Sequence, residues 1–260
     1  MLLRVRVTLP DRPGALGQVA RTLGVAGADI VQVVVLERLG GRAVDDFTVV
    51  WPGASRVERL LAGLAAIPGV QVDGVWRAIG APVAGGHDAE LLAQVAANPA
   101  DGLATLVDAV PALLAADWAA AAVVPADWAA RSGTAPRAQL DGPGLDDLPL
   151  PEVPAFGGEP TSAYASWRAP TPLRLPEVTP LRARPLTGPD GTRYAVAPFG
   201  RAGLVLVIAR GDDDELPAAA FHVTEVDRIA QLVRAAAVIL GDRLDHAGVP
   251  PVVSSVIDPS

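Results

Sequence analysis

The sequence predicts an α+β protein built from two units, and three observations lead to this prediction. Residues 1–78 alternate between strand-like and helix-like patterns, in the order strand, helix, strand, strand, helix, strand. Residues 79–87, IGAPVAGGH, show no periodicity and are typical of a linker. Residues 88–247 return to patterned helices and strands and end on one long amphipathic helix.

Composition excludes several classes of function. Half of the 260 residues are hydrophobic, and the formal net charge is -8. We expect no nucleic-acid partner, because such binding depends on Lys and Arg that neutralise phosphates. The absence of cysteine rules out disulfides, thiolate nucleophiles and cysteine-based metal sites. No apolar run approaches the ~20 residues that span a bilayer, and the N-terminus does not read as a signal peptide. We therefore expect no membrane partner and a cytoplasmic location.

The first strand and helix show the clearest patterns. Apolar and polar residues alternate from Leu3 to Leu9, which is typical of a strand with one buried face. After a break over 10–13, apolar residues recur at helical spacing from Leu16 to Leu23. The other elements predicted for this unit are a strand over 30–36, a hairpin turn at Gly40–Gly41, a strand over 44–51, a helix over 57–64 capped by Ser55, and a strand over 70–76. This order predicts a ferredoxin-like βαββαβ unit, a four-stranded antiparallel sheet with two helices on one face.

The second unit is less regular. Helical spacing runs from Leu91 to Val95 and from Leu103 to Leu114, where Pro111 either kinks or ends the helix. Strands are predicted over 118–124, 128–131, 178–186, 194–198 and 203–209, and a long terminal helix is predicted to begin with Thr224 as its N-cap. The insert 133–176 is rich in Pro and Gly and is expected to be a mobile lid or a disordered segment, and the tail 248–260 is expected to be frayed.

The loop DRPGAL, between the first strand and the first helix, carries the argument for a ligand. A helix N-terminus leaves backbone N–H groups without partners, and Gly14 leaves that backbone open to close approach. Such a place suits a carboxylate, while Asp11 and Asp29 suit an ammonium group. Together these groups describe a free amino acid. Pro-Gly is also an ordinary turn device at a strand–helix junction, so an interaction module without a ligand remains an alternative.

The same residues resemble a known family. DRPGAL after a strand, followed by a helix and then by GADI, is similar to an ACT domain, a regulatory amino-acid-binding module, over residues 2–78. The resemblance implies a homodimer that binds its effector between the first loop and the start of the second strand. Carried over to this chain, the site residues are Asp11, Arg12, Pro13, Gly14, Ala15 and Leu16, with Asp29 and Ile30 opposite.

A weaker resemblance concerns the end of the second unit. GLVLVIARG, a loop, and HVTEVDRIAQLV at the start of a long helix resemble the close of a GAF domain, over residues 203–244. This implies a GAF-like sensory domain over 88–247, with a central antiparallel sheet and long helices at both ends. Without cysteine, a thioether-linked bilin is impossible, and we find no cyclic-nucleotide signature. No cofactor is expected.

Other candidate sites favour ordinary roles. His87, His222 and His246 show no metal-binding spacing and are read as surface or capping residues. The run 212–215 is read as a solvated acidic loop rather than a cation site, so no metal is expected. No pairing of a base with a nucleophile stands out, so no catalytic residue is assigned. The sequence thus predicts a non-enzymatic sensor of a small effector. The alternatives are an enzyme with an unrecognised active site in 88–247 and a dimerisation or interaction scaffold.

Overall fold

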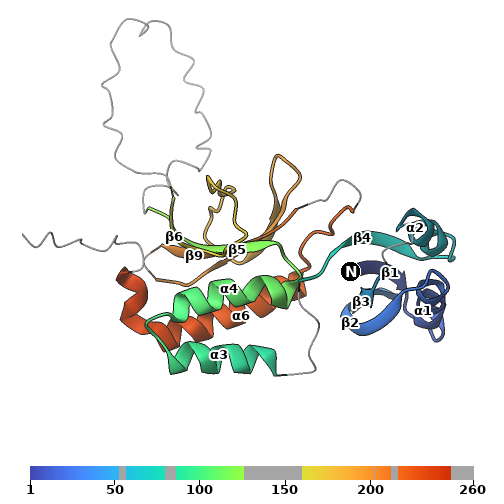
Figure 1. The fold of residues 1–260 in the computed structure, drawn as a ribbon, viewed down its shortest axis with the longest axis horizontal. Coiled ribbons are helices and arrows are strands. Elements are labelled where there is room, and N and C mark those ends of the chain that lie inside the picture. The colour runs from blue at the N-terminus through green and yellow to red at the C-terminus, as the bar shows by residue number, and fades with distance from the viewer. Residues whose placement is uncertain (53–56, 80–85, 126–159, 202, 212–215, 247–260) are drawn as a thin grey trace, which may run out of the picture.

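The computed structural model describes residues 1–52, 57–79, 86–125, 160–201, 203–211 and 216–246. These residues form two antiparallel sheets, one of four strands and one of five, together with five α-helices (Figure 1). The α+β class predicted from the sequence is confirmed.

The N-terminal unit, residues 1–78, shows the order of elements that the sequence predicts. Its elements are β1 (Leu2–Pro10), α1 (Ala15–Val25), β2 (Asp29–Leu39), β3 (Arg42–Val50), α2 (Val57–Ala65) and β4 (Gln71–Arg77). The strands pair antiparallel in the order β2-β3-β1-β4. Both helices lie on one face of this sheet (Figure 1). Ser55, the predicted cap of α2, lies outside the described residues.

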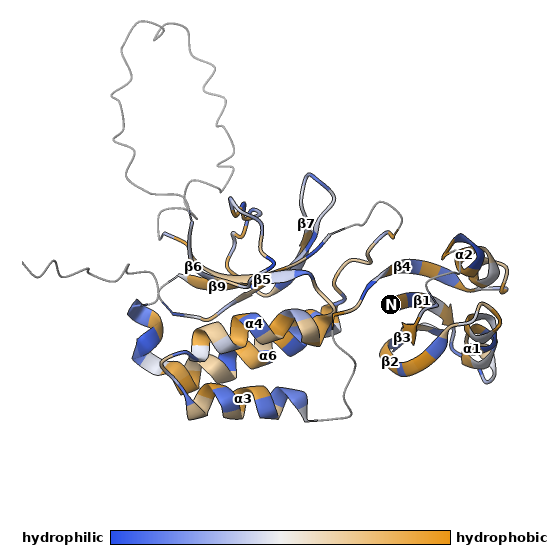
Figure 2. Ribbon diagram, in the orientation of Figure 1, coloured by the Kyte–Doolittle hydropathy of each residue, from blue (hydrophilic) through white to orange (hydrophobic). Residues whose placement is uncertain are grey.

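Alternation along β1 builds the core between the sheet and these helices. Leu3, Val5 and Val7 are fully buried and pack with Val19 and Leu23 of α1. In Figure 2 hydrophilic and hydrophobic residues alternate along the strands of this sheet. The expectation of a single buried face is wrong, however, because part of the polar face is buried as well. Arg6 on that face is only 3% exposed.

The C-terminal unit supplies what covers that polar face. Its elements are α3 (His87–Ala97), α4 (Gly102–Leu114), β5 (Trp118–Val123), β6 (Thr161–Ala165), β7 (Arg184–Thr187), β8 (Arg193–Pro198), β9 (Leu204–Arg210), α6 (Val223–Leu240) and a 3-10 helix, η1 (Gly241–His246). The sheet order is β6-β5-β9-β8-β7. Helices α4 and α6 lie against one face of this sheet, and α3 packs against both helices (Figure 1).

Several predicted elements of this unit need correction. Part of the insert 133–176 is ordered, because β6 pairs with β5 at the edge of the sheet. The strand predicted over 178–186 is limited to β7 and begins only at Arg184. Of the two alternatives for Pro111, that it ends the helix is wrong, because α4 continues for three residues beyond it. The strand predicted over 128–131, the acidic run 212–215 and the tail 248–260 lie outside the described residues, as does most of the linker 79–87.

Helix α6 begins at Val223, so Thr224 is not its N-cap. The cap is His222, whose Nδ1 accepts a hydrogen bond from the Thr224 backbone N–H at 3.3 Å. The Glu225 carboxylate completes a capping box by accepting the His222 backbone N–H at 2.8 Å. The capping box therefore starts two residues earlier than predicted, and its acidic residue is Glu225. No described helix is both long enough and apolar enough to cross a membrane.

Candidate functional site

The predicted loop lies on the surface between β1 and α1. Gly14 is the N-cap of α1, with φ of 87°, and no side chain caps the first turn. This left-handed conformation favours glycine, as the sequence suggested. Arg12, Pro13 and Leu16 are exposed, whereas Ala15 is buried in the core. The first turn of α1 therefore presents backbone N–H groups next to an open surface.

Asp11 already has a cationic partner. Its carboxylate accepts a hydrogen bond from Nη2 of Arg38 at 2.5 Å, and its backbone N–H donates to the carbonyl oxygen of Gly41 at 2.8 Å. Both partners belong to the β2–β3 hairpin. An effector amine would have to compete with Arg38 for this carboxylate.

Asp29 and Ile30 lie at the opposite end of the sheet from this loop. The loop follows Pro10, which pairs with Arg42 at one end of the sheet. Asp29 pairs with Val50 at the other end, where Val50 also pairs with Leu2. About nine residues of strand, roughly 30 Å, separate the two groups. The predicted site residues are therefore not brought together within one chain.

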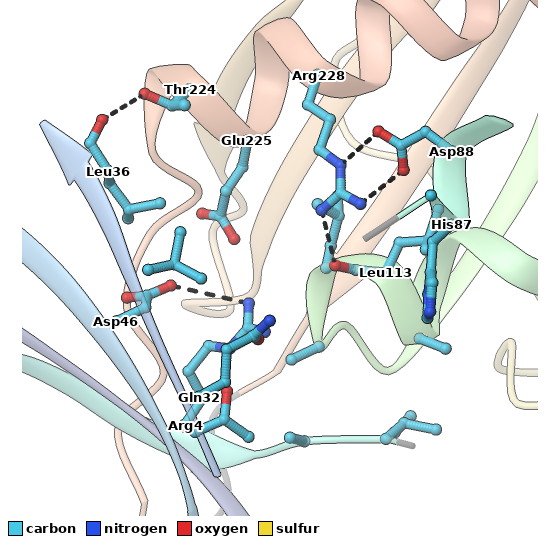
Figure 3. Close-up of a pocket in the computed structure, with 18 of the residues that line it drawn as sticks. Arg4, Gln32, Leu36, Asp46, His87, Asp88, Leu113, Thr224, Glu225 and Arg228 are labelled. Carbon is cyan, nitrogen blue, oxygen red and sulfur yellow. Dashed lines mark hydrogen bonds and ion pairs between the residues drawn. The ribbon is translucent and has the colours of Figure 1, made fainter. Parts of the chain in front are cut away.

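A cavity of about 540 Å³ lies where the polar face of the first sheet meets helices α3, α4 and α6. That volume falls within the range of ~300–1,000 Å³ typical of small-molecule sites. Figure 3 shows Arg4, Gln32 and Asp46 on the sheet side, facing His87, Asp88, Thr224, Glu225 and Arg228 from the helices. The apolar part of the lining is formed by Val34, Leu36, Ala78, Ile79, Ala89 and the end of α4, Ala112–Ala115.

Next to the cavity, a buried ionic cluster joins the two units. Asp46 of β3 receives two parallel bonds from Arg6 of β1, at 2.7 Å from Nε and 2.8 Å from Nη2. The same Nη2 donates to Oε2 of Glu225 at 2.8 Å, and Oε1 of Glu225 accepts from Nη2 of Arg210 at 3.0 Å. Two arginines and two carboxylates thus form a chain of charge-assisted hydrogen bonds.

Aromatic rings and helix carbonyls hold Arg210 in place. Its guanidinium carbon lies 4.3 Å from the ring centroid of Trp76 and 4.1 Å from that of Phe221. It also donates to the carbonyl oxygens of Leu114 and Ala115, and Trp76 Nε1 donates to the second of these at 2.9 Å. These donors satisfy carbonyls at the C-terminus of α4, where positive charge is favourable.

The charges in the cluster are tuned by burial and by the neighbours. Burial alone disfavours the charged form of Glu225, but the positive charges of Arg210 and Arg6 outweigh it and lower the pKa of Glu225 to about 2. Burial likewise acts against charged Arg6, yet Asp46 and Glu225 together raise its pKa above the ordinary value. Arg210 is fully buried and donates a hydrogen bond to one carboxylate, that of Glu225. Desolvation lowers the pKa of Arg210 from its ordinary value.

The remaining ion pair on the cavity wall joins α3 to α6. Arg228 donates from Nη2 and Nε to the two oxygens of Asp88, at 2.6 and 2.9 Å. This geometry is the planar fork that arginine forms with carboxylates. Asp88 lies in the first turn of α3, so residues near the predicted linker also shape the cavity. Among the described residues, no group of three or more His, Asp or Glu could hold a metal ion.

The sequence did not reveal this cavity. The usable signal was the charge on the non-core face of the first sheet, where Arg4 and Arg6 alternate with buried apolar residues. Asp46 lies opposite Arg6 in the register. Such a face is ordinarily exposed to solvent, and its burial depends on residues more than 200 positions later in the chain.

Comparisons with known proteins do not assign the chain to a family. No family model matches it, and neither does any curated protein. Among solved structures, a formyltetrahydrofolate deformylase from Pseudomonas putida KT2440 matches with 17% identity, 38% of this chain covered and a TM-score of 0.27. This chain spans 39% of that structure's length. An unknown protein from Galdieria sulphuraria matches with 18% identity, 48% of this chain, 72% of its own chain and a TM-score of 0.27. Scores this low carry no argument about fold or function.

Proposed function

We propose that this protein is a non-enzymatic regulatory sensor that binds a small molecule in the cavity between its two units. The observation that carries the proposal is the cavity itself, which combines a volume of about 540 Å³ with a lining of charged and apolar side chains. A ligand there would touch both units at once, because Arg4 and Gln32 come from the first sheet and Arg228 comes from α6.

Contact with both units gives the ligand a way to act. A ligand shifts a conformational equilibrium only by its difference in affinity for the two states. A molecule bound against both the sheet and α6 would have that difference, since it would lose its contacts with one unit if the units separated. Ligand binding would then favour the arrangement held by the buried ionic cluster.

The proposal includes a division of the chain into domains. We infer an ACT-like, ferredoxin-like domain over 1–78, a linker over 79–87, a GAF-like sensory domain over 88–247 and a tail over 248–260 that lies outside the described residues. The βαββαβ order and the antiparallel registers of the first sheet support the first of these assignments. The five-stranded sheet that ends in the long helix α6 supports the second. A cytoplasmic location is part of the same proposal.

A thermal-shift screen tests the site. The melting temperature of the purified wild-type protein and that of Ala112→Phe are each measured with added amino acids, organic acids and nucleotides. Ala112 is exposed on α4 and lines the cavity, so a phenylalanine there fills the cavity without disturbing the core. Ligand at about a hundred times its Kd stabilises the native state by roughly 2.7 kcal/mol, which moves Tm by several degrees.

The expected result is a shift in the wild-type protein that Ala112→Phe abolishes. Shifts that are equal in both proteins would place the ligand elsewhere. Conversion of an added compound by the wild-type protein would favour the alternative of an enzyme with its active site in 88–247. A complete lack of shifts would favour an interaction scaffold.

A second candidate is an amino-acid effector bound between two copies of the chain. It is favoured by the left-handed Gly14, which leaves the first turn of α1 without a side-chain cap. Asp29 and Ile30 of a second copy would have to complete such a site, because they lie at the far end of the sheet in the same chain. Sedimentation with and without amino acids tests it: ligand-dependent dimers should form, and Asp11→Ala and Gly14→Asp should lose the response while staying folded. Retention of the response in both variants would remove these residues from the site.

A further inference from the structure

Among the three carboxylates of the cavity lining and the four arginines around them, Arg4 is the arginine that forms no hydrogen bond with a carboxylate; only Arg4 and Arg228 of these arginines belong to the lining itself. The three carboxylates are those of Asp46, Asp88 and Glu225. Each of them forms an ion pair with an arginine. Arg6 pairs with Asp46, and Arg228 pairs with Asp88. Glu225 pairs with both Arg6 and Arg210. Arg4 is the fourth arginine of this group, and no fourth carboxylate lines the described part of the cavity.

Arg4 is only weakly paired. Its Nη1 lies 3.8 Å from Oδ2 of Asp46, beyond hydrogen-bonding distance, and that carboxylate already receives two bonds from Arg6. The Nε of Arg4 is buried, and the described residues offer it no hydrogen-bond partner. A buried guanidinium N–H without an acceptor costs free energy.

Arg4 is buried among both negative and positive neighbours. Burial lowers the pKa of Arg4 from its ordinary value, although the negative charges of Asp46 and Glu225 act in the opposite direction. The positive charges of Arg6 and Arg228 add to the lowering. In Figure 3 the Arg4 side chain lies at the base of the cavity, across from the helices.

The remaining lining defines the rest of the ligand. The end of α4 contributes Ala112, Leu113 and Leu114, and β2 contributes Val34 and Leu36, all of them aliphatic. No Phe, Tyr or Trp belongs to the described lining, where the imidazole of His87 is the one aromatic ring, so most of the lining is better suited to an aliphatic chain than to a base. An ammonium group would find the three carboxylates already occupied by arginines.

We propose that the cavity binds a small aliphatic carboxylate without an amino group, with its carboxylate on the guanidinium of Arg4 and its carbon chain along the end of α4. This inference rests on the proposed sensor function and names the chemical class of its ligand. It also separates this site from the amino-acid site considered at Gly14. The planar fork of arginine matches a carboxylate with two parallel hydrogen bonds, which a lysine cannot reproduce.

Four probes that share a six-carbon chain test the inference by isothermal titration calorimetry on the full chain. They are hexanoate, L-norleucine, hexylamine and 1-hexanol. Hexanoate should bind, norleucine should bind at least about tenfold more weakly, and the amine and the alcohol should give no measurable heat. The variants are Arg4→Gln, Arg4→Lys and Ala112→Phe, with Arg21→Gln as the control because Arg21 is exposed on α1, away from the cavity lining.

The expected Kd for hexanoate rises at least about tenfold in Arg4→Gln, the order expected for one charged hydrogen-bonding partner. Arg4→Lys should recover only part of the affinity, and Arg21→Gln should bind like the wild type. Ala112→Phe should abolish binding while leaving Arg4 unchanged, which keeps the test informative even if the Arg4 variants fold poorly.

Two results would overturn the inference. Tighter binding of norleucine or hexylamine than of hexanoate would show that the site prefers an amine. Hexanoate affinity unchanged in both Arg4→Gln and Ala112→Phe would show that the carboxylate binds elsewhere. If another compound class gives a thermal shift that Ala112→Phe abolishes, the sensor function stands and only the ligand class is wrong. If no compound gives a thermal shift that Ala112→Phe abolishes, both the sensor function and the ligand class are wrong.

Discussion

Glu225 of α6 and Arg6 of β1 lie 219 positions apart in the sequence, yet their side chains meet at 2.8 Å, and both are about 5% exposed or less. Through this contact the last helix holds the polar face of the first sheet. Because the pair is buried, the loss of one partner leaves an uncompensated charge in a region of low polarity.

Replacement of Glu225 by glutamine should destabilise the whole chain. Arg210 would lose its only carboxylate partner among the described residues and Arg6 one of two, which predicts a fall of about 3–5 kcal/mol in the free energy of unfolding. Urea denaturation followed by circular dichroism measures it. Glu58→Gln, at an exposed position in the first turn of α2, is the matched control and should change stability by less than about 0.5 kcal/mol. Equal stability of the two variants would contradict a structural role for the pair.

The same residue should make stability depend on pH under acid conditions. The pKa of Glu225 is about 2 in the folded chain, against an ordinary value of 4.5. A carboxylate with a lowered pKa adds stability that is complete above its unfolded pKa and is lost as the pH falls toward its folded pKa. The wild type should therefore lose this contribution between pH 4.5 and about 2. Denaturation midpoints across that range should fall less steeply in Glu225→Gln, and parallel curves would refute the assignment.

Asp45 should act in the opposite sense. It is 3% exposed, one of its oxygens has no partner among the described residues, and burial together with the charge of Asp46 raises its pKa. Because the folded state favours the protonated acid, ionisation costs stability as the pH rises above the ordinary carboxyl pKa. Asp45→Asn should be more stable than the wild type at pH 7, by an amount of the order of 1 kcal/mol. The difference should vanish near pH 3, and a gain of the same size at both pH values would point to packing instead.

Gly74 of β4 should tolerate no larger residue. A Cβ built there would lie 2.4 Å from the backbone nitrogen of Ala219, in the segment that leads into α6. Neither backbone can yield easily, because the neighbouring Val75 N–H donates to the carbonyl of Pro217 at 2.9 Å. Gly74→Ala should cost about 1–3 kcal/mol in thermal denaturation. Gly17→Ala, in the first turn of α1 where a Cβ meets no neighbouring atom, should instead stabilise by roughly 0.5 kcal/mol. The same effect from both substitutions would contradict the close approach at Gly74.

Local patterns predicted the elements of the first unit well. Alternation along 3–9, helical spacing after Gly14 and the paired glycines at 40 and 41 are short-range signals, and those glycines adopt φ of 61° and 76° as a hairpin turn requires. The edge strand β6 was missed because it is only five residues long and follows a Pro-rich stretch. The cap of α6 was misplaced because Thr224 is a common capping residue and His222 is not.

The cavity was beyond the reach of those signals. Its walls combine Arg4 with Arg228, and nothing in either local sequence indicates that they meet. Sequence reasoning took the charges on β1 as a solvated face, which is their usual role when one side of a sheet is packed. Only the pairing of Arg6 with Asp46 and Glu225 makes burial of that face energetically tolerable.

The bond between Arg6 and Asp46 has a consequence for the order in which the protein is made. Both residues are synthesised before α6, which begins more than 170 residues further along the chain. Until α6 arrives, the face that it will cover presents an ion pair and polar groups to water instead of a bare apolar surface. A nascent chain can therefore wait with its first sheet formed, with little tendency to aggregate through that face, until Glu225 closes the junction.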